Sequence, residues 1–180
     1  KTINGRKYSF DEDGRMNAEW VLYDATPSET KATDSQCTAS YTNGFRYYGS
    51  PEDGAIVTKG WFQVVPDSYL SAGDFDDDSS NWYYSDKDGK LVASEIKTIN
   101  GKKYVFDSYG VMKSGLLAVK FEGKSTTKVV DVIDGDDNST YLFDTEDSFK
   151  ARVSDLYTEG DYKLYYLGSG DDGSMKTGKK

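Results

Sequence analysis

The sequence predicts an all-β fold, an elongated solenoid of stacked β-hairpin repeats with loop or strand insertions. Three observations predict it. A ten-residue segment occurs twice almost unchanged, as KTINGRKYSF at 1–10 and KTINGKKYVF at 97–106. Aromatic residues make up 14% of the chain and 15 of them are Tyr, so Tyr must supply much of the core. The 18 glycines, together with the lack of an amphipathic helical segment, favour short strands joined by tight turns.

The repeated unit has a spacing that is typical of a β-hairpin. In the copy around Gly110, Tyr104 and Phe106 alternate onto one face of a short strand, and Asp107 opens a four-residue turn that ends at Gly110. Met112 then begins the returning strand. A single hairpin cannot bury its apolar face in water, so each unit must pack against its neighbours.

Related copies run along the whole chain. Five have a turn glycine, at Gly14, Gly54, Gly89, Gly110 and Gly173. A sixth copy, TYLFDTEDSF, has Asp147 where the glycine belongs. Residues 1–180 are therefore predicted to form a single array of about six repeats, with turns near 14, 54, 89, 110, 147 and 173. Because the chain begins inside a repeat, it is expected to be a fragment of a longer protein.

The spacing between copies is uneven, and the extra residues fall in three inserts at 24–43, 62–81 and 119–140. The first two are polar and lack the repeat pattern, so they are expected to form loops or extra strands on one side of the array. The third contains KVVDVI at 128–133, which could add a strand.

Composition argues against several functions. The net charge of −9 disfavours nucleic acid as a partner, because phosphates are bound by Lys and Arg. The chain has no His and a single Cys37, which removes the commonest catalytic and zinc-binding side chains. The acidic clusters at 74–78 and 134–138 do not have the spacing of a calcium-binding EF-hand loop and are interpreted as solvated loops. No metal, cofactor, enzymatic activity or membrane span is expected.

Two segments, NWYYSDKDGKL at 81–91 and DGAIVTKGW at 53–61, resemble the choline-binding or cell-wall-binding repeats. INGKKYVFD at 99–107 is similar to the related repeats of glucan-binding proteins and of the receptor-binding tails of glucosylating toxins. The resemblance implies a solenoid of hairpins, an extracellular location on the bacterial cell surface, and non-covalent attachment to a cell-wall polymer, whether teichoic acid, choline or polysaccharide.

Ligand sites in that family form between consecutive hairpins, where aromatic rings enclose a quaternary ammonium group through the negative faces of the rings. The resemblance therefore implies one candidate site made by Trp61 with Trp82 and Tyr84, and a second made by Trp20 with Tyr47. Only Gly60 and Trp61 retain the Gly-Trp pair of the family.

The expected function is a non-catalytic wall-binding or glycan-binding module of a secreted bacterial surface protein. The alternative is a structural spacer or protein-adhesion stalk, in which the aromatic side chains are buried and the inserts present the surface for a host or surface protein.

Overall fold

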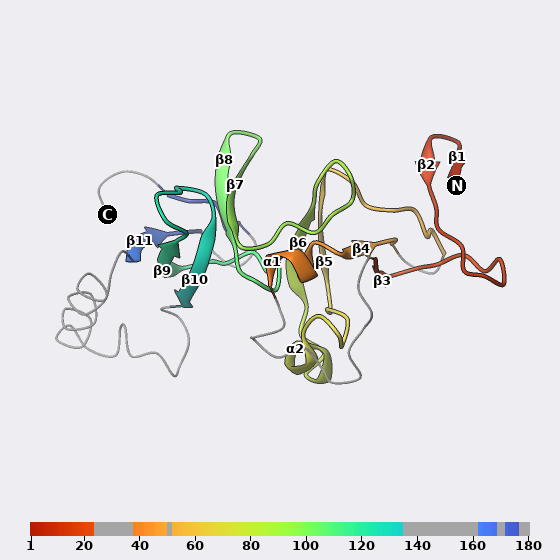
Figure 1. Cartoon of the computed structure of the whole chain (residues 1–180), viewed down its shortest axis with the longest axis horizontal. Coiled ribbons are helices and arrows are strands. Elements are labelled where there is room, and N and C mark those ends of the chain that lie inside the picture. The colour runs from red at the N-terminus through yellow and green to blue at the C-terminus, as the bar shows by residue number, and fades with distance from the viewer. Residues whose placement is uncertain (24–37, 50–51, 135–161, 169–171, 177–180) are drawn as a thin grey trace. The chain divides into compact units, whose positions relative to one another are not determined.

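The computed structural model describes residues 1–23, 38–49, 52–134, 162–168 and 172–176. These residues form eleven strands and two helices of a single turn, so the predicted all-β class is confirmed (Figure 1). All of the strands lie in small sheets of two or three strands. The stacking of the hairpins into one elongated array stays a prediction.

Contacts divide the chain into two compact units. Unit 1 contains Lys1–Ala93 and Tyr109–Val111, and unit 2 contains Ser94–Ser108 and Met112–Lys180. The elements of unit 1 are β1 (Thr2–Ile3), β2 (Arg6–Lys7), β3 (Trp20–Leu22), α1 (Ala39–Thr42), β4 (Phe45–Tyr47), β5 (Gly60–Val64), α2 (Ala72–Asp76) and β6 (Asn81–Ser85). The elements of unit 2 are β7 (Glu95–Ile99), β8 (Lys102–Phe106), β9 (Leu116–Phe121), β10 (Val129–Asp134) and β11 (Tyr162–Tyr166).

The longer antiparallel pairings join one copy of the repeat to the next. They are β3 with β4, β5 with β6, β7 with β8, and β9 with both β10 and β11. The turns at Gly14, Gly89, Gly110 and Gly173 are instead closed by single antiparallel bridges, such as Phe10 with Met16 and Ser85 with Leu91. After these four glycines the expected returning strand is thus a single bridged residue.

A left-handed backbone explains why this return is so short. Glu19, Lys59, Ser94 and Gly115 each stand five residues after a turn glycine, and each has a positive φ, between 47° and 73°. This conformation ends the extended segment and turns the chain into the next strand.

The turn glycines also have a packing role. Four of the five pack against the side chain two residues after the preceding turn glycine, and the pairs are Gly54 with Met16, Gly89 with Ile56, Gly110 with Leu91, and Gly173 with Met112. At Gly110 an added Cβ would lie 2.9 Å from Leu91 Cδ2 and 3.1 Å from the carbonyl oxygen of Val92. Glycine therefore allows an approach that any side chain would block. The predicted turn near residue 147 lies outside the described residues.

Each unit has its own hydrophobic core. The cluster of unit 1 is largely aromatic and consists of Phe45, Phe62, Leu70, Tyr83 and Leu91. The cluster of unit 2 is largely aliphatic and consists of Ile96, Val105, Leu117, Val119, Phe121, Val129 and Leu167. The expectation that Tyr supplies core volume holds for Tyr83, which is fully buried.

The inserts differ in structure. In the 62–81 insert, the first residues continue β5, and α2 and its flanking turns complete the loop, so that β5 pairs directly with β6. In the 24–43 insert, the described part contains α1, and residues 24–37 lie outside the described part. In the third insert, β10 confirms the strand expected at 128–133.

Ser85 is expected to be a weak point of the unit 1 core. Its hydroxyl oxygen is buried and has no hydrogen-bond partner among the described residues, in a position where two other copies have Phe10 and Phe106. A buried hydroxyl without a partner costs about 1–3 kcal/mol. Ser85→Ala is therefore expected to raise the free energy of unfolding by about 1 kcal/mol, measured by urea titration.

Ser71 provides the matched control for this measurement, because its hydroxyl donates to Asp74 Oδ2 at 3.2 Å. Ser71→Ala removes a hydrogen bond that is made, so it is expected to lower the free energy of unfolding by about 0.5–1 kcal/mol. Destabilisation by both substitutions would show that the hydroxyl of Ser85 is satisfied in solution.

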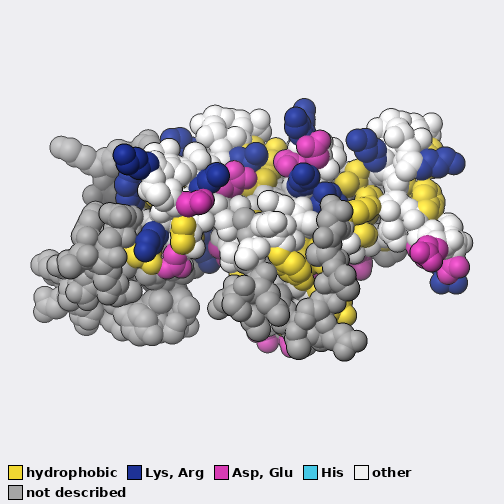
Figure 2. All heavy atoms as spheres, viewed as in Figure 1, with side chains coloured by type: hydrophobic (Ala, Val, Ile, Leu, Met, Phe, Trp, Pro, Cys, Tyr) yellow, Lys and Arg dark blue, Asp and Glu magenta, His cyan; other side chains and the backbone are white. Residues whose placement is uncertain are grey.

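Among the described residues, no helix has the length and apolar character needed to cross a membrane. On the face shown in Figure 2, Lys and Arg side chains are interspersed with Asp and Glu side chains, and no extended basic patch is visible.

Candidate aromatic binding face

The β5–β6 hairpin has two aromatic faces. Phe62 pairs with Tyr83 in the register, and both side chains are buried in the core of unit 1. Side chains alternate between the faces of a strand, so Trp61, Trp82 and Tyr84 all lie on the opposite face. There Trp61 stands opposite Tyr84, and Trp82 stands opposite Gln63. We call the face formed by Trp61, Trp82 and Tyr84 the aromatic face.

The rings of the aromatic face are close together and steeply inclined. The ring centroids of Trp61 and Trp82 are 6.4 Å apart with an angle of 82° between the planes. Those of Trp61 and Tyr84 are 5.2 Å apart with an angle of 66°. All three side chains are half-buried. The structure therefore brings together the three residues of the first candidate site, because the 62–81 insert loops out and adds no strand between β5 and β6.

Trp61 does not occupy the position that Trp20 occupies in its own copy. Trp20 directly follows the left-handed Glu19, whereas Gly60 directly follows the left-handed Lys59 and Trp61 comes one residue later. A shift of one residue moves a side chain to the other face of a strand. The Gly-Trp pair that best matched the family repeat is thus displaced, and Trp61 points away from the core cluster that Trp20 contacts.

Counting from the turn glycine would have revealed this difference in the sequence. Trp20 is the sixth residue after Gly14, and Trp61 is the seventh after Gly54. The two Trp positions match by residue type, but a difference of one residue in spacing places their side chains on opposite faces.

The second candidate pair, Trp20 and Tyr47, is also brought together, with ring centroids 5.3 Å apart on the paired strands β3 and β4. Both rings are half-buried and pack against the core of unit 1. Trp20 contacts Tyr83 with centroids at 5.1 Å, and Tyr47 stacks on Phe62 with centroids at 4.6 Å and planes 8° apart. Much of these two ring surfaces is therefore covered by protein.

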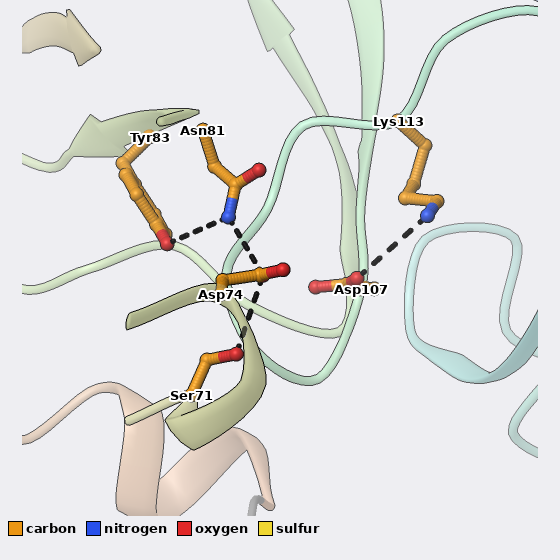
Figure 3. A network of polar contacts seen from close by, with 6 residues as sticks. All are labelled: Ser71, Asp74, Asn81, Tyr83, Asp107 and Lys113. Atoms are coloured by element: carbon orange, nitrogen blue, oxygen red, sulfur yellow. Dashed lines mark hydrogen bonds and ion pairs between the residues drawn. The ribbon is translucent and has the colours of Figure 1, made fainter. Parts of the chain in front are cut away.

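The insert is fastened to the hairpin by a polar network (Figure 3). Asp74 Oδ2 accepts hydrogen bonds from Ser71 Oγ at 3.2 Å and from Asn81 Nδ2 at 2.9 Å. Asn81 also donates to the hydroxyl oxygen of Tyr83 at 3.3 Å. This network joins α2 to the start of β6, so Asp74 has a structural role that its place in an acidic run did not indicate.

Other acidic residues also have structural partners. In unit 2, Asp107 lies 4.0 Å from Lys113 Nζ, and both side chains are largely covered. Asp172 forms an ion pair with Lys176 and accepts a hydrogen bond from Ser174, and these contacts lower the pKa of its carboxyl to about 2. Within the described part of the chain, no three acidic or Cys side chains are grouped so that they could hold a metal ion.

No family model matches the chain, and no curated protein is significantly similar to it. Solved structures are similar to it. CbpJ from Streptococcus pneumoniae TIGR4 is 20% identical, with 99% of this chain and 35% of that chain covered and a TM-score of 0.45. Choline binding protein F from Streptococcus pneumoniae, solved with a peptidoglycan analogue, is 18% identical, with 99% and 34% covered and a TM-score of 0.45.

The choline-binding domain of CbpL from Streptococcus pneumoniae is 18% identical, with 99% of this chain and 64% of that chain covered and a TM-score of 0.37. The chain spans about a third of the length of the first two structures. These TM-scores are below 0.5, so no binding residue is transferred from them to this chain.

Proposed function

We propose that this chain is a non-catalytic module that binds a cell-wall polymer or glycan as part of a secreted bacterial surface protein, and that the aromatic face is its ligand site. The observation that carries the proposal is the gathering of Trp61, Trp82 and Tyr84 on the face of the β5–β6 hairpin that points away from the core. The resemblance of the repeats to wall-binding repeats supports the same conclusion.

The geometry of the aromatic face suits a compact ligand that contacts several ring faces. Trp61 is steeply inclined to both of its neighbours, so the three rings do not form one flat platform. A ring face that is not covered by a neighbouring ring attracts a cation such as a quaternary ammonium. Rings of this size also bury a large area against an apolar sugar face. Choline and wall glycan are therefore the ligands to test first.

Trp82→Ala is expected to weaken the binding of purified cell wall and of choline tenfold or more. A desolvated contact between a cation and a ring contributes about 2 kcal/mol, which corresponds to more than a tenfold change in affinity. The measurement is co-sedimentation with purified wall and calorimetric titration with choline, after circular dichroism has shown that the variant is folded.

Tyr69→Ala is the matched control, because Tyr69 is an aromatic residue of the same unit that is 39% exposed and lies outside the aromatic face. It is expected to bind as the unchanged protein does. Equal binding by the Trp82 and Tyr69 variants would remove the aromatic face as the ligand site.

The alternative function, a spacer or adhesion stalk, is favoured by the packing of Trp20 and Tyr47 against the core of unit 1. In that case the aromatic side chains serve packing alone. The absence of wall, choline and glycan binding by the unchanged protein would support this alternative and would contradict the proposed ligand site.

A further inference from the structure

We propose that unit 1 has a second binding site, for a protonated primary amine on an aliphatic stem, in a pocket between β3 and the 62–81 insert. This pocket, which we call the insert pocket, has a volume of about 440 Å³. The residues that line it include Glu19, Asp67 and Asp78 and the aromatic residues Trp20, Tyr47 and Phe75. The site goes beyond the proposed function and uses none of the residues of the aromatic face.

The charge of the insert pocket selects a cation. Three acidic residues line it, and none of the described residues that line it is Lys or Arg. The negative charge reaches the rings, because the pKa of Tyr47 is raised by burial and also by the charge of Glu19. A cationic group that enters would be attracted by these acidic side chains.

The hydrogen-bonding groups favour an amine over a quaternary ammonium. Carboxylate oxygens accept hydrogen bonds, and an ammonium group with N–H bonds can donate up to three. A quaternary ammonium has no donor and depends on exposed ring faces. In this pocket much of the ring surface of Trp20 and Tyr47 is covered by Tyr83 and Phe62. The rings alone therefore cannot enclose a quaternary ammonium group.

The walls of the pocket are held in place before a ligand arrives. The indole Nε1 of Trp20 donates to the carbonyl oxygen of Val65 at 3.0 Å and thereby ties β3 to the insert. Asp67 Oδ1 accepts from the amide of Tyr69 at 2.9 Å, which orients its carboxylate. The bonds of Asp74 to Ser71 and Asn81 hold α2, the helix that carries Phe75. Pre-organised groups lose less entropy when they bind.

The pocket is large enough for more than an ammonium group. Small-molecule sites commonly have volumes of about 300 Å³ or more, and an aliphatic stem can fill the part beside Phe75. Phe75 is 49% exposed, which is unusual for a large apolar side chain and leaves its ring available to methylene groups. The side chain of lysine, free or borne on a wall peptide, has this combination of stem and charge.

The test is an NMR titration of the unchanged protein with Nα-acetyl-lysine amide and two of its derivatives. Acetylation of the side-chain nitrogen removes the charge, and trimethylation keeps the charge but removes the N–H donors. We expect shifts of the resonances of Glu19 and Asp67 with the free amine, at least tenfold weaker binding with the trimethylated form, and no binding with the acetylated form. Equal or tighter binding of the trimethylated form would overturn the assignment to an amine with N–H donors.

Variants distinguish this site from the aromatic face. The double variant Glu19→Gln with Asp67→Asn is isosteric and is expected to weaken amine binding tenfold or more, whereas Trp82→Ala leaves amine binding unchanged. Loss of amine binding in the Trp82 variant alone would place the amine on the aromatic face and overturn the proposal. Binding of wall fragments with free amino groups is then compared with binding of acetylated fragments. If the ligand is an amine borne on the wall, acetylation abolishes the binding of the fragments to the insert pocket. If the ligand is a free amine, neither kind of fragment binds there.

Discussion

Replacing Gly110 by alanine is expected to lower the free energy of unfolding of unit 1 by roughly 3 kcal/mol. Gly110 has a φ of 78°, a left-handed conformation that costs an L-residue about 1–2 kcal/mol. The added Cβ would also lie 2.9 Å from Leu91 Cδ2 and 3.1 Å from the backbone oxygen of Val92. Overpacking of this kind adds about 1–3 kcal/mol, because a backbone atom cannot move aside as a flexible side chain can.

Gly14→Ala separates the two causes. Gly14 has nearly the same φ, 79°, but an added Cβ would meet no atom within 4 Å. It is therefore expected to cost only about 1 kcal/mol, the conformational part. Urea unfolding followed by tryptophan fluorescence reports on unit 1, because all three Trp residues belong to it. Equal losses in the two variants would show that the contact between Gly110 and Leu91 is not tight in solution.

This pair of glycines also shows what the sequence could and could not predict. The turn, the aspartate before it and the aliphatic residue two positions after it are local features, and local spacing was sufficient to predict them. The contact of each turn glycine with the aliphatic residue of another copy depends on how copies meet. The pattern within one copy therefore does not predict the contact between copies. The contact nevertheless accounts for the recurrence of an apolar residue two positions after the turn glycine, at Met16, Ile56, Leu91 and Met112.

Strand pairing was harder to predict than strand position. The aromatic strands before Gly54, Gly89, Gly110 and Gly173 are confirmed as β4, β6, β8 and β11. The longer partner of each is the strand that begins six residues after the preceding turn glycine. The left-handed residues at Glu19, Lys59 and Ser94 direct the chain into that strand, and none of the three is a glycine. Because non-glycine residues seldom adopt a positive φ, no residue type at these positions indicated the turn.

The residues of the two candidate sites lie close together on paired strands, with Trp20 opposite Tyr47, Trp61 opposite Tyr84, and Trp82 opposite Gln63. That they bind a ligand stays a prediction. The two candidate sites differ in how far their rings are covered, because of the way one hairpin packs on another. One face of the β5–β6 hairpin is covered by the β3–β4 hairpin, so Tyr47 and Trp20 pack into the core, while Trp61 lies on the other face. The insert pocket was not predicted, because its walls come from segments that are distant in sequence.

Phe62→Ala is expected to lower the free energy of unfolding of unit 1 by about 4 kcal/mol, a larger loss than that expected for Gly110→Ala. Phe62 is 9% exposed and lies at the centre of the aromatic cluster. Its ring stacks on Tyr47 at 4.6 Å and on Tyr83 at 5.6 Å, and it meets Trp20 at 5.6 Å. Truncation leaves a cavity between large, rigid rings, which cannot collapse as readily as aliphatic side chains do.

Phe75→Ala makes the same chemical change in the same unit at a side chain that is 49% exposed, so it is expected to change the free energy of unfolding by no more than about 0.5 kcal/mol. The contrast tests whether the ring stack or the total aromatic content stabilises unit 1. A loss near 4 kcal/mol for Phe62 alone assigns the stability to the stack that joins the β3–β4 hairpin to the β5–β6 hairpin. Similar small losses for both would mean that the stack is not formed in solution, and both the aromatic face and the insert pocket would then lack the scaffold that positions them.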